Sequence, residues 1–155
     1  MRFSTRTWKL TENFYSKLNE TEKSCLNGTR NSIPGGFIVN SVNIALIGAG
    51  SMANGVHYPS LYEFDDVNIV GLCDLVESKL KKTAEKFEIK NTFTDYKEMI
   101  KKTAPDAVYI LMPPQHLFSL VIHSLNQGCH VFIEKPPGLT LHQTKTMALT
   151  AEKNG

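Results

Sequence analysis

A glycine-rich hexapeptide carries the clearest chemical signal in this sequence: Gly48-Ala49-Gly50-Ser51-Met52-Ala53, with the pattern G-x-G-x-x-A. An apolar run precedes it and a helical pattern follows, which is the context in which such a turn binds phosphate. The first glycine permits a tight turn, the second lets a pyrophosphate approach the backbone, and the third small residue lets helix and strand pack closely. The N–H groups at the helix start would face the phosphates. We therefore expect a dinucleotide here; a purely structural turn or a different nucleotide-like ligand is the alternative.

Asp74 follows the next apolar run, 21 positions after Ala53. An acidic residue at that place accepts hydrogen bonds from the adenosine ribose hydroxyls of NAD. The alternative role is the N-cap of the helix that begins near Val76. A carboxylate repels a 2′-phosphate, and no arginine follows Arg30, so only lysines such as Lys79 could hold one. The sequence therefore favours NAD over NADP.

Two further polar groups follow later apolar runs. The first is Met112-Pro113-Pro114-Gln115-His116 and the second is Glu134-Lys135-Pro136-Pro137. Ligands of open parallel sheets bind at the carboxyl ends of the strands, where both groups would lie. Lys135 can donate to a substrate oxygen, or act as an acid or base where burial lowers its pKa, whereas a surface lysine paired with a carboxylate is the simpler interpretation. His116 either lines the site or caps its helix, and one of the two bonds before a proline in the second group is a candidate for the cis form.

The cysteines and the histidine nearest the glycine-rich turn receive simpler interpretations. His57, in the helix after that turn, is expected to pack rather than to catalyse. The cysteines, Cys25, Cys73 and Cys129, form no C-x-x-C pair and no zinc-ligand spacing, so no metal site is expected. Their odd number, in a core-forming sequence without a secretory signal, suggests reduced thiols in the cytosol.

Short apolar runs alternate with amphipathic segments from Val42 onward. Five runs predict strands: 42–47, 67–73, 92–93, 106–112 and 129–133. Five segments predict helices: 51–64, which Pro59 should kink or split, then 76–87, 95–102, 115–127 and 140–153. In the second helix, the expected buried stripe is Val76, Leu80, Ala84 and Phe87. The alternation predicts an α/β fold with a Rossmann-type doubly wound parallel sheet of about five strands, truncated before a sixth.

Length and composition bound the class of protein. The 155 residues, 41% hydrophobic and 21% charged, are ordinary for one globular domain. No apolar run approaches the roughly 18 residues of a membrane span. A net charge of +2 gives no reason to expect nucleic acid or an anionic membrane as a partner. Residues 1–41 are rich in Ser, Thr and Asn and contain the breaker Pro34-Gly35-Gly36, so we expect a mobile N-terminal extension before a dinucleotide-binding domain over 42–155.

The stretch from Val42 to Gly155 resembles the Gfo/Idh/MocA oxidoreductases, a family that includes glucose–fructose oxidoreductase and inositol dehydrogenase. The residues that carry the resemblance are the turn at 48–53, Asp74, Asp106-Ala107-Val108 leading to Pro113 and His116, and Gly128-Cys129-His130-Val131-Phe132-Ile133-Glu134-Lys135-Pro136. The E-K-P triplet in the last stretch is the family's most recognisable mark.

The resemblance implies hydride transfer between a nicotinamide cofactor and a sugar, cyclitol or related polyol-like substrate. It implies that Lys135 lies beside the nicotinamide and the reacting carbon, contacts the substrate hydroxyl and assists proton transfer. Glu134 and Pro136 would shape that corner, and the loop from Pro113 to His116 would line the nicotinamide side.

Members of this family carry a second α+β domain, which supports substrate binding and oligomer contacts and supplies further catalytic residues. The sequence ends before such a domain, so a catalytically incomplete cofactor-binding module with a sensing or scaffolding role is the alternative to an oxidoreductase. An unrelated Rossmann-like enzyme, such as a methyltransferase, is a third interpretation, against which Glu134-Lys135-Pro136 argues. The resemblance also implies a homo-oligomer for the full-length protein.

Overall fold

The structure is a computed structural model that describes residues 41–155. Its strands are β1 (Val42–Ile47), β2 (Val67–Cys73), β3 (Thr92–Phe93), β4 (Ala107–Ile110) and β5 (His130–Ile133). Its helical segments are the π turn η1 (Ala53–His57), α3 (Tyr58–Leu61), α4 (Glu77–Lys86), α5 (Tyr96–Thr103), α6 (Pro114–Asn126) and α7 (Leu141–Asn154). None of these helices is long and apolar enough to cross a membrane. The extension expected over residues 1–41 lies, apart from its last residue, outside the described part of the chain.

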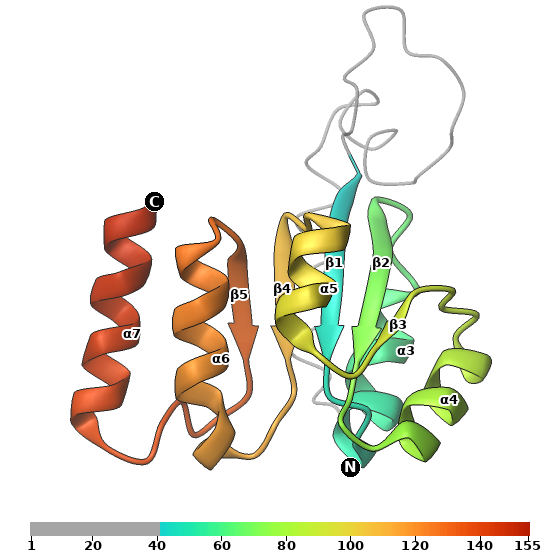
Figure 1. The fold of residues 1–155 in the computed structure, drawn as a ribbon, viewed down its shortest axis with the longest axis horizontal. Coiled ribbons are helices and arrows are strands. Elements are labelled where there is room, and N and C mark those ends of the chain that lie inside the picture. The colour runs from blue at the N-terminus through green and yellow to red at the C-terminus, as the bar shows by residue number, and fades with distance from the viewer. Residues whose placement is uncertain (1–40) are drawn as a thin grey trace, which may run out of the picture. The chain divides into compact units, whose positions relative to one another are not determined.

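All five strands lie parallel in one sheet, in the order β3-β2-β1-β4-β5. The order reverses between β1 and β4, which is the arrangement of a doubly wound α/β fold and confirms the predicted class. Figure 1 shows that the strands point the same way, so their carboxyl ends share one edge of the sheet. Every polar group singled out in the sequence follows one of these ends: residues 48–53 follow β1, Asp74 follows β2, residues 112–116 follow β4, and residues 134–136 follow β5.

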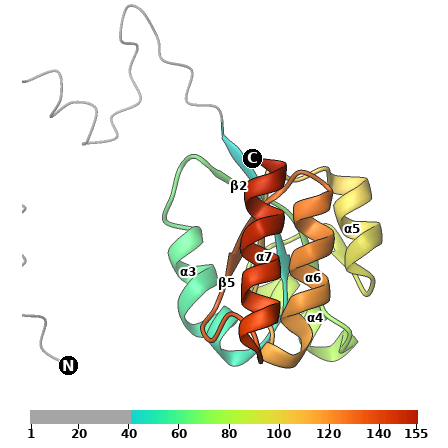
Figure 2. The same cartoon turned by 90° about the vertical axis from the view of Figure 1, so that its left-hand side faces the viewer.

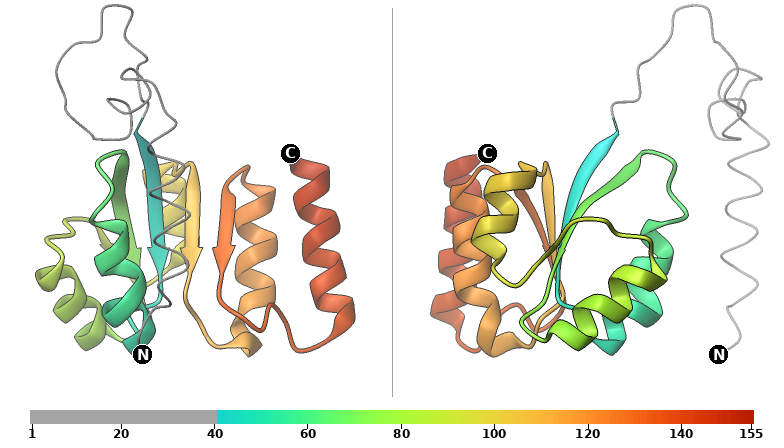
Figure 3. Two further views of the ribbon diagram at one scale, coloured as in Figure 1. Left: turned by 180° about the vertical axis from the view of Figure 1, so that it is seen from behind. Right: turned by 45° about the vertical axis from the view of Figure 1, so that its right-hand side comes forward.

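Each face of the sheet is covered by its own helices. The segments η1, α3 and α4 pack on one face, around a core that includes Leu46 and Leu72. Helices α5 and α6 pack on the other face, around Val108 and Ile110, and α7 lies against α6. Figure 2 shows the layers from the side, and Figure 3 shows the face covered by α3 and α4. Because β1 is covered on both faces, its last four residues, Ile44 to Ile47, are all buried and form a continuous apolar run rather than an alternating one.

Local chemistry explains where the last two helices begin and end. Helix α6 has Pro114 in its first turn, where a missing N–H costs nothing, and it ends before Gly128, whose φ of +80° suits a left-handed cap. Thr140 caps α7 by accepting a hydrogen bond from the N–H of Gln143 at 3.2 Å. The Gln143 side chain accepts in return from the N–H of Leu139 at 2.9 Å, so the two side chains satisfy two backbone N–H groups at the start of α7.

The helix expected over residues 51–64 is shorter than predicted and contains the π turn η1. In a π turn an N–H bonds to the carbonyl five residues back, as the N–H of Tyr58 does here. Pro59 has no N–H for the next carbonyl, that of Asn54, and the Lys86 ammonium bonds that oxygen at 2.8 Å. The proline therefore divides the segment, as expected, into a π turn and a single turn of α-helix.

Element boundaries account for the other differences from prediction. Val76 is 45% exposed because it is the N-cap of α4 rather than part of its buried stripe, whereas Leu80 and Phe87 are buried as expected. Strands β4 and β5 are shorter than the apolar runs at 106–112 and 129–133, because only residues 107–110 and 130–133 pair in the sheet.

Burial governs the reactivity of two thiols. It raises the pKa of Cys73 to about 12, with Asp74 adding to the effect, and it also raises the pKa of Cys129. Since the thiolate is the reactive form, we expect both thiols to resist alkylation in the folded protein. In a Cys25→Ser variant, iodoacetamide at mildly alkaline pH should label the native protein at least about a hundredfold more slowly than the urea-unfolded protein. Rapid labelling of native Cys73, mapped by peptide mass spectrometry, would contradict this expectation.

Candidate functional site

The glycine-rich turn follows β1 directly and lies in close contact with the end of β4. Gly48 has a φ of +105°, and a Cβ on it would lie 2.5 Å from the carbonyl oxygen of Leu111. Both constraints require glycine at this position. Gly50 differs, because a Cβ there would meet no atom of residues 41–155 within 4 Å, which leaves its face of the turn open among these residues. Ala53 is 1% exposed and packs in the core, as the small third residue of the pattern should.

Tyr58 and Asn54 hold the carbonyl groups of the turn. The fully buried Tyr58 hydroxyl donates to the carbonyl of Gly48, and burial, followed by the nearby Asp74 charge, raises the pKa of Tyr58 above its ordinary value. The Asn54 amide donates to the carbonyls of the next two residues of the turn, at 3.1 and 3.0 Å. The hydroxyl of buried Thr83 donates to Oδ1 of Asn54 at 3.1 Å, which ties the turn to α4.

With its carbonyl groups held, the turn presents N–H groups. Among the hydrogen bonds of residues 41–155, none engages the N–H of Gly50, Ser51 or Met52. Ser51 and Met52 are exposed, and the three groups lie at the start of a helical segment, where the peptide dipoles add partial positive charge. Such an arrangement receives an anionic group such as a phosphate.

The carboxylate of Asp74 faces the same turn. Its Oδ2 accepts a hydrogen bond from the N–H of Ala49 at 2.7 Å, and its Oδ1 accepts from the N–H of Val76 at 2.8 Å. Val76 is the N-cap of α4, so the N-cap role for Asp74 does not hold. Instead, the carboxylate fastens the turn to the loop after β2, and its remaining lone pairs can accept further hydrogen bonds.

A pocket of about 170 Å³ opens beside Asp74, close to the point where the strand order reverses. Met112 and His116, from the loop after β4, line it together with Asp74. Pro113 and Pro114, which lie between those two residues, form the N-cap and the first turn of α6. In the described part of the chain no side chain caps α6, so His116 lines the pocket and does not cap its helix.

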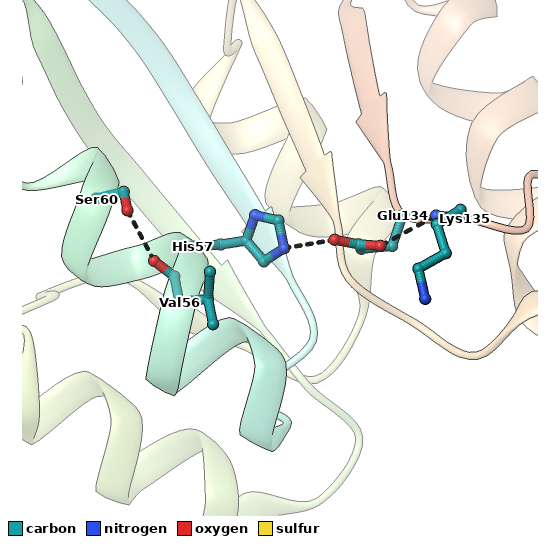
Figure 4. Close-up of polar contacts among 5 residues, drawn as sticks. All are labelled: Val56, His57, Ser60, Glu134 and Lys135. Carbon is teal, nitrogen blue, oxygen red and sulfur yellow. Dashed lines mark hydrogen bonds and ion pairs between the residues drawn. The ribbon is translucent and has the colours of Figure 1, made fainter. Parts of the chain in front are cut away.

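The E-K-P triplet lies at the same edge, after β5. The Oε1 atom of Glu134 lies 2.8 Å from Nε2 of His57, and its Oε2 accepts from the N–H of Lys135 at 3.1 Å (Figure 4). These hydrogen bonds, the one with His57 first, lower the pKa of Glu134 below its ordinary value. The peptide bond between Lys135 and Pro136 is cis, as predicted for one of the two prolines.

Lys135 presents its ammonium to solvent. Its side chain is exposed and points away from the Glu134 carboxylate (Figure 4). Within the described residues this ammonium makes no ion pair, so the simpler interpretation of a lysine paired with a carboxylate finds no partner there. An ammonium of this kind can donate hydrogen bonds to a ligand at the edge of the sheet.

Three contributions to the site were not predicted from the sequence. Asn54 and Tyr58 were not singled out. They lie four and eight positions after Gly50, and this helical spacing is the one signal that points to them. His57 packs as expected, with its ring 5.6 Å from that of Phe132. Its hydrogen bond to the E-K-P triplet joins positions 77 residues apart, for which the sequence holds no local signal.

Tyr58→Phe tests how much the hydrogen bond from Tyr58 to the Gly48 carbonyl stabilises the fold. The substitution should lower the free energy of unfolding by about 1–2 kcal/mol, because the buried Gly48 carbonyl loses its donor. Tyr62→Phe is the matched control: its hydroxyl donates to the carbonyl of Phe87, but the side chain is 49% exposed, so water can replace it and the loss should stay below about 0.5 kcal/mol. Urea denaturation measures both. Equal stability of the two variants would show that the buried hydroxyl is dispensable.

Comparison with known proteins places this geometry in a family. The sequence model of the Gfo/Idh/MocA oxidoreductases, an oxidoreductase family with an NAD-binding Rossmann fold, matches residues 42–155. D-glucoside 3-dehydrogenase of Escherichia coli (strain K12) is 33% identical over 114 residues, which are 74% of this chain and 32% of that protein. The chain spans about a quarter to a third of the length of the curated relatives that it matches.

Solved structures share the fold. The WlbA dehydrogenase from Chromobacterium violaceum, in complex with NADH and UDP-GlcNAcA, superposes with a TM-score of 0.71 at 25% identity, over 79% of this chain and 35% of that one. The myo-inositol 2-dehydrogenase from Lactobacillus plantarum gives 0.68 at 27% identity, over 74% and 34%. Sequence and fold agree, and the chain belongs to the Gfo/Idh/MocA family of oxidoreductases through its NAD-binding Rossmann fold.

Proposed function

We propose that residues 42–155 bind a nicotinamide dinucleotide across the carboxyl edge of the sheet. One observation carries the proposal: the turn offers three unengaged N–H groups, of Gly50, Ser51 and Met52, while Tyr58 and Asn54 hold its carbonyl groups. A turn whose N–H groups are available while its carbonyl oxygens are engaged suits a pyrophosphate. The complex of the related WlbA dehydrogenase with NADH supports the same class of ligand.

Each end of the cofactor has its own residues in this proposal. Gly48, Ala49 and Ala53 shape the turn under the pyrophosphate, and the lone pairs that Asp74 retains accept hydrogen bonds from the ribose hydroxyls. Met112 and His116 line the same pocket as Asp74. We therefore assign them to the ribose side of the cofactor, rather than to the nicotinamide side that the family resemblance implies. Pro113 and Pro114 set the path of that loop.

For the whole protein we propose an oxidoreductase acting on a sugar, cyclitol or related polyol. Bound nicotinamide supplies the hydride acceptor or donor. Lys135 would contact the reacting oxygen: as an ammonium it would give that oxygen the proton gained in reduction, and as a neutral amine it would take the hydroxyl proton lost in oxidation. Glu134 and Pro136 would shape the loop that presents the lysine. The names of two relatives, a D-glucoside 3-dehydrogenase and a myo-inositol 2-dehydrogenase, support this class of substrate.

Cofactor binding without turnover is the second candidate function. It is favoured by the Lys135 ammonium, which has no acidic or basic partner within residues 41–155. A dehydrogenase assay with NAD and a panel of sugars and polyols separates the two. Turnover supports the oxidoreductase, and binding of NADH without turnover supports the module.

We also propose a cytosolic location and, for the full-length protein, a homo-oligomer. The free, buried thiols of Cys73 and Cys129 support a reducing compartment. The homo-oligomer rests on the family resemblance alone.

Gly50→Ala separates folding from binding. The free energy of unfolding should stay within about 0.5 kcal/mol of the wild type, because a Cβ there meets no atom within 4 Å. Affinity for NADH, followed by fluorescence, should fall at least about tenfold, because the methyl group occupies the space of the pyrophosphate. Gly55→Ala, where a Cβ also meets nothing within 4 Å, is the matched control and should bind NADH like the wild type. Unchanged affinity in Gly50→Ala would argue against a pyrophosphate at this turn.

The wild-type protein should bind NADH at least about tenfold more tightly than NADPH, because the Asp74 carboxylate repels a 2′-phosphate. Asp74→Ser should narrow the ratio of the two dissociation constants, measured by fluorescence titration. The ratio reports what Asp74 does at the 2′ position, where its carboxylate repels a phosphate and accepts a hydrogen bond from a hydroxyl, since the lost hydrogen bond to Ala49 affects both cofactors alike. Tighter binding of NADPH than of NADH by the wild type would reverse the assignment.

A further inference from the structure

His57 joins two parts of the carboxyl edge that are distant in the sequence. Its Nε2 lies 2.8 Å from Oε1 of Glu134, so the segment after the glycine-rich turn is bonded to the loop after β5. Figure 4 shows the imidazole reaching from η1 toward the end of β5, with the Glu134 carboxylate between it and Lys135.

The ring of His57 is enclosed. Its side chain is 14% exposed, and its centroid lies 5.6 Å from the ring of Phe132 and 6.3 Å from that of Tyr109. Those two rings stack on each other with centroids 4.3 Å apart. Neighbours on this side leave few rotamers open to the imidazole, which keeps Nε2 directed at the carboxylate.

The backbone that carries His57 is held as well. A π turn contains one more residue than an α turn, so it changes the direction in which the residues at its end project. The carbonyl of Asn54, left without an N–H by Pro59, is bonded by the Lys86 ammonium at 2.8 Å. Asn54 also bonds the glycine-rich turn through its side chain. The turn and His57 are therefore parts of one internally bonded segment.

The Glu134 carboxylate links His57 to the backbone of Lys135. While Oε1 is held by His57, Oε2 accepts from the N–H of Lys135 at 3.1 Å. The lowered pKa of Glu134 keeps the side chain a carboxylate, which has acceptor capacity on both oxygens. A carboxylate fixed at one oxygen cannot swing away from the backbone that the other oxygen holds.

We propose that His57 is a positioning residue that orients Lys135 through Glu134, and so fixes the lysine relative to the glycine-rich turn. His57 itself touches neither cofactor nor substrate in this role. The proposal extends the proposed function, because it takes Lys135 to lie beside the nicotinamide.

Hydrogen exchange at the Lys135 amide, followed by NMR on the 155-residue chain, tests the link without any ligand. His57→Phe keeps a ring against Phe132 but removes the hydrogen bond, and should raise the exchange rate at least about fivefold. His57→Gln places an amide N–H near the position of Nε2 and should restore most of the protection. The matched control is His123→Phe. The ring centroid of His123, on α6, lies 5.3 Å from that of Tyr96, on α5, so this substitution should leave the exchange rate of the Lys135 amide unchanged.

Titration with NADH and with ADP-ribose, which lacks the nicotinamide, tests the consequence for the cofactor. His57→Phe should weaken binding of NADH about threefold to tenfold and leave binding of ADP-ribose within about twofold, because only the nicotinamide end would lie beside Lys135. His57→Gln should recover the affinity for NADH.

Unchanged exchange at Lys135 in a folded His57→Phe variant, checked by its thermal melt, would overturn the inference. Lost protection with unchanged affinity for NADH would overturn it too. If His57→Phe does not fold, His57→Asn replaces it, since the shorter amide cannot reach Oε1 of Glu134 and the Lys135 amide should again lose protection. A wild-type chain that binds neither ligand would refute the proposed function, and exchange alone would then decide the link from His57 to Lys135.

Discussion

The close approach of Gly48 to β4 is the constraint on which the rest of the site depends. With a φ of +105° and Leu111 only 2.5 Å from where a Cβ would lie, the backbone can turn sharply between the ends of β1 and β4. The N–H of Gly48 bonds to the carbonyl of Cys73 at 2.8 Å, so β2 holds the same residue from the other side. A turn fixed by both neighbouring strands is what allows the following helix to begin directly above the end of β1.

Satisfaction of polar groups decides what this turn offers to a ligand. Side chains from the helix that follows it, Tyr58 and Asn54, hold its carbonyl oxygens, and Asp74 holds the N–H of Ala49. The groups left for a ligand are N–H groups at the start of a helix, where the peptide dipoles add a partial positive charge. The net charge of the whole chain is only +2. Affinity for an anion therefore depends on oriented dipoles rather than on an excess of basic residues.

The two halves of the site are joined by side chains and not only by the sheet. Among residues 41–155, strand β5 pairs with β4 alone, at the end of the strand order farthest from β3. The loop after β5 is bonded to the segment after the glycine-rich turn through Glu134 and His57, beside the stacked rings of Tyr109 and Phe132. The Gfo/Idh/MocA relationship accounts for the fold and the class of cofactor, whereas this side-chain link follows from the structure of the chain itself.

The sequence by itself determined the fold class, the glycine-rich turn, Asp74 and the E-K-P triplet, because each depends on local backbone chemistry or on the period of apolar residues. The ends of β4, the exposure of Val76 and the π turn depend on which backbone groups find partners, as when Lys86 reaches the carbonyl of Asn54. Only the tertiary structure decided that Asp74 holds the turn, that Met112 and His116 share its pocket and that His57 bonds Glu134. These contacts join residues 25 to 77 positions apart, and the order of the strands, which no local pattern encodes, brings them together.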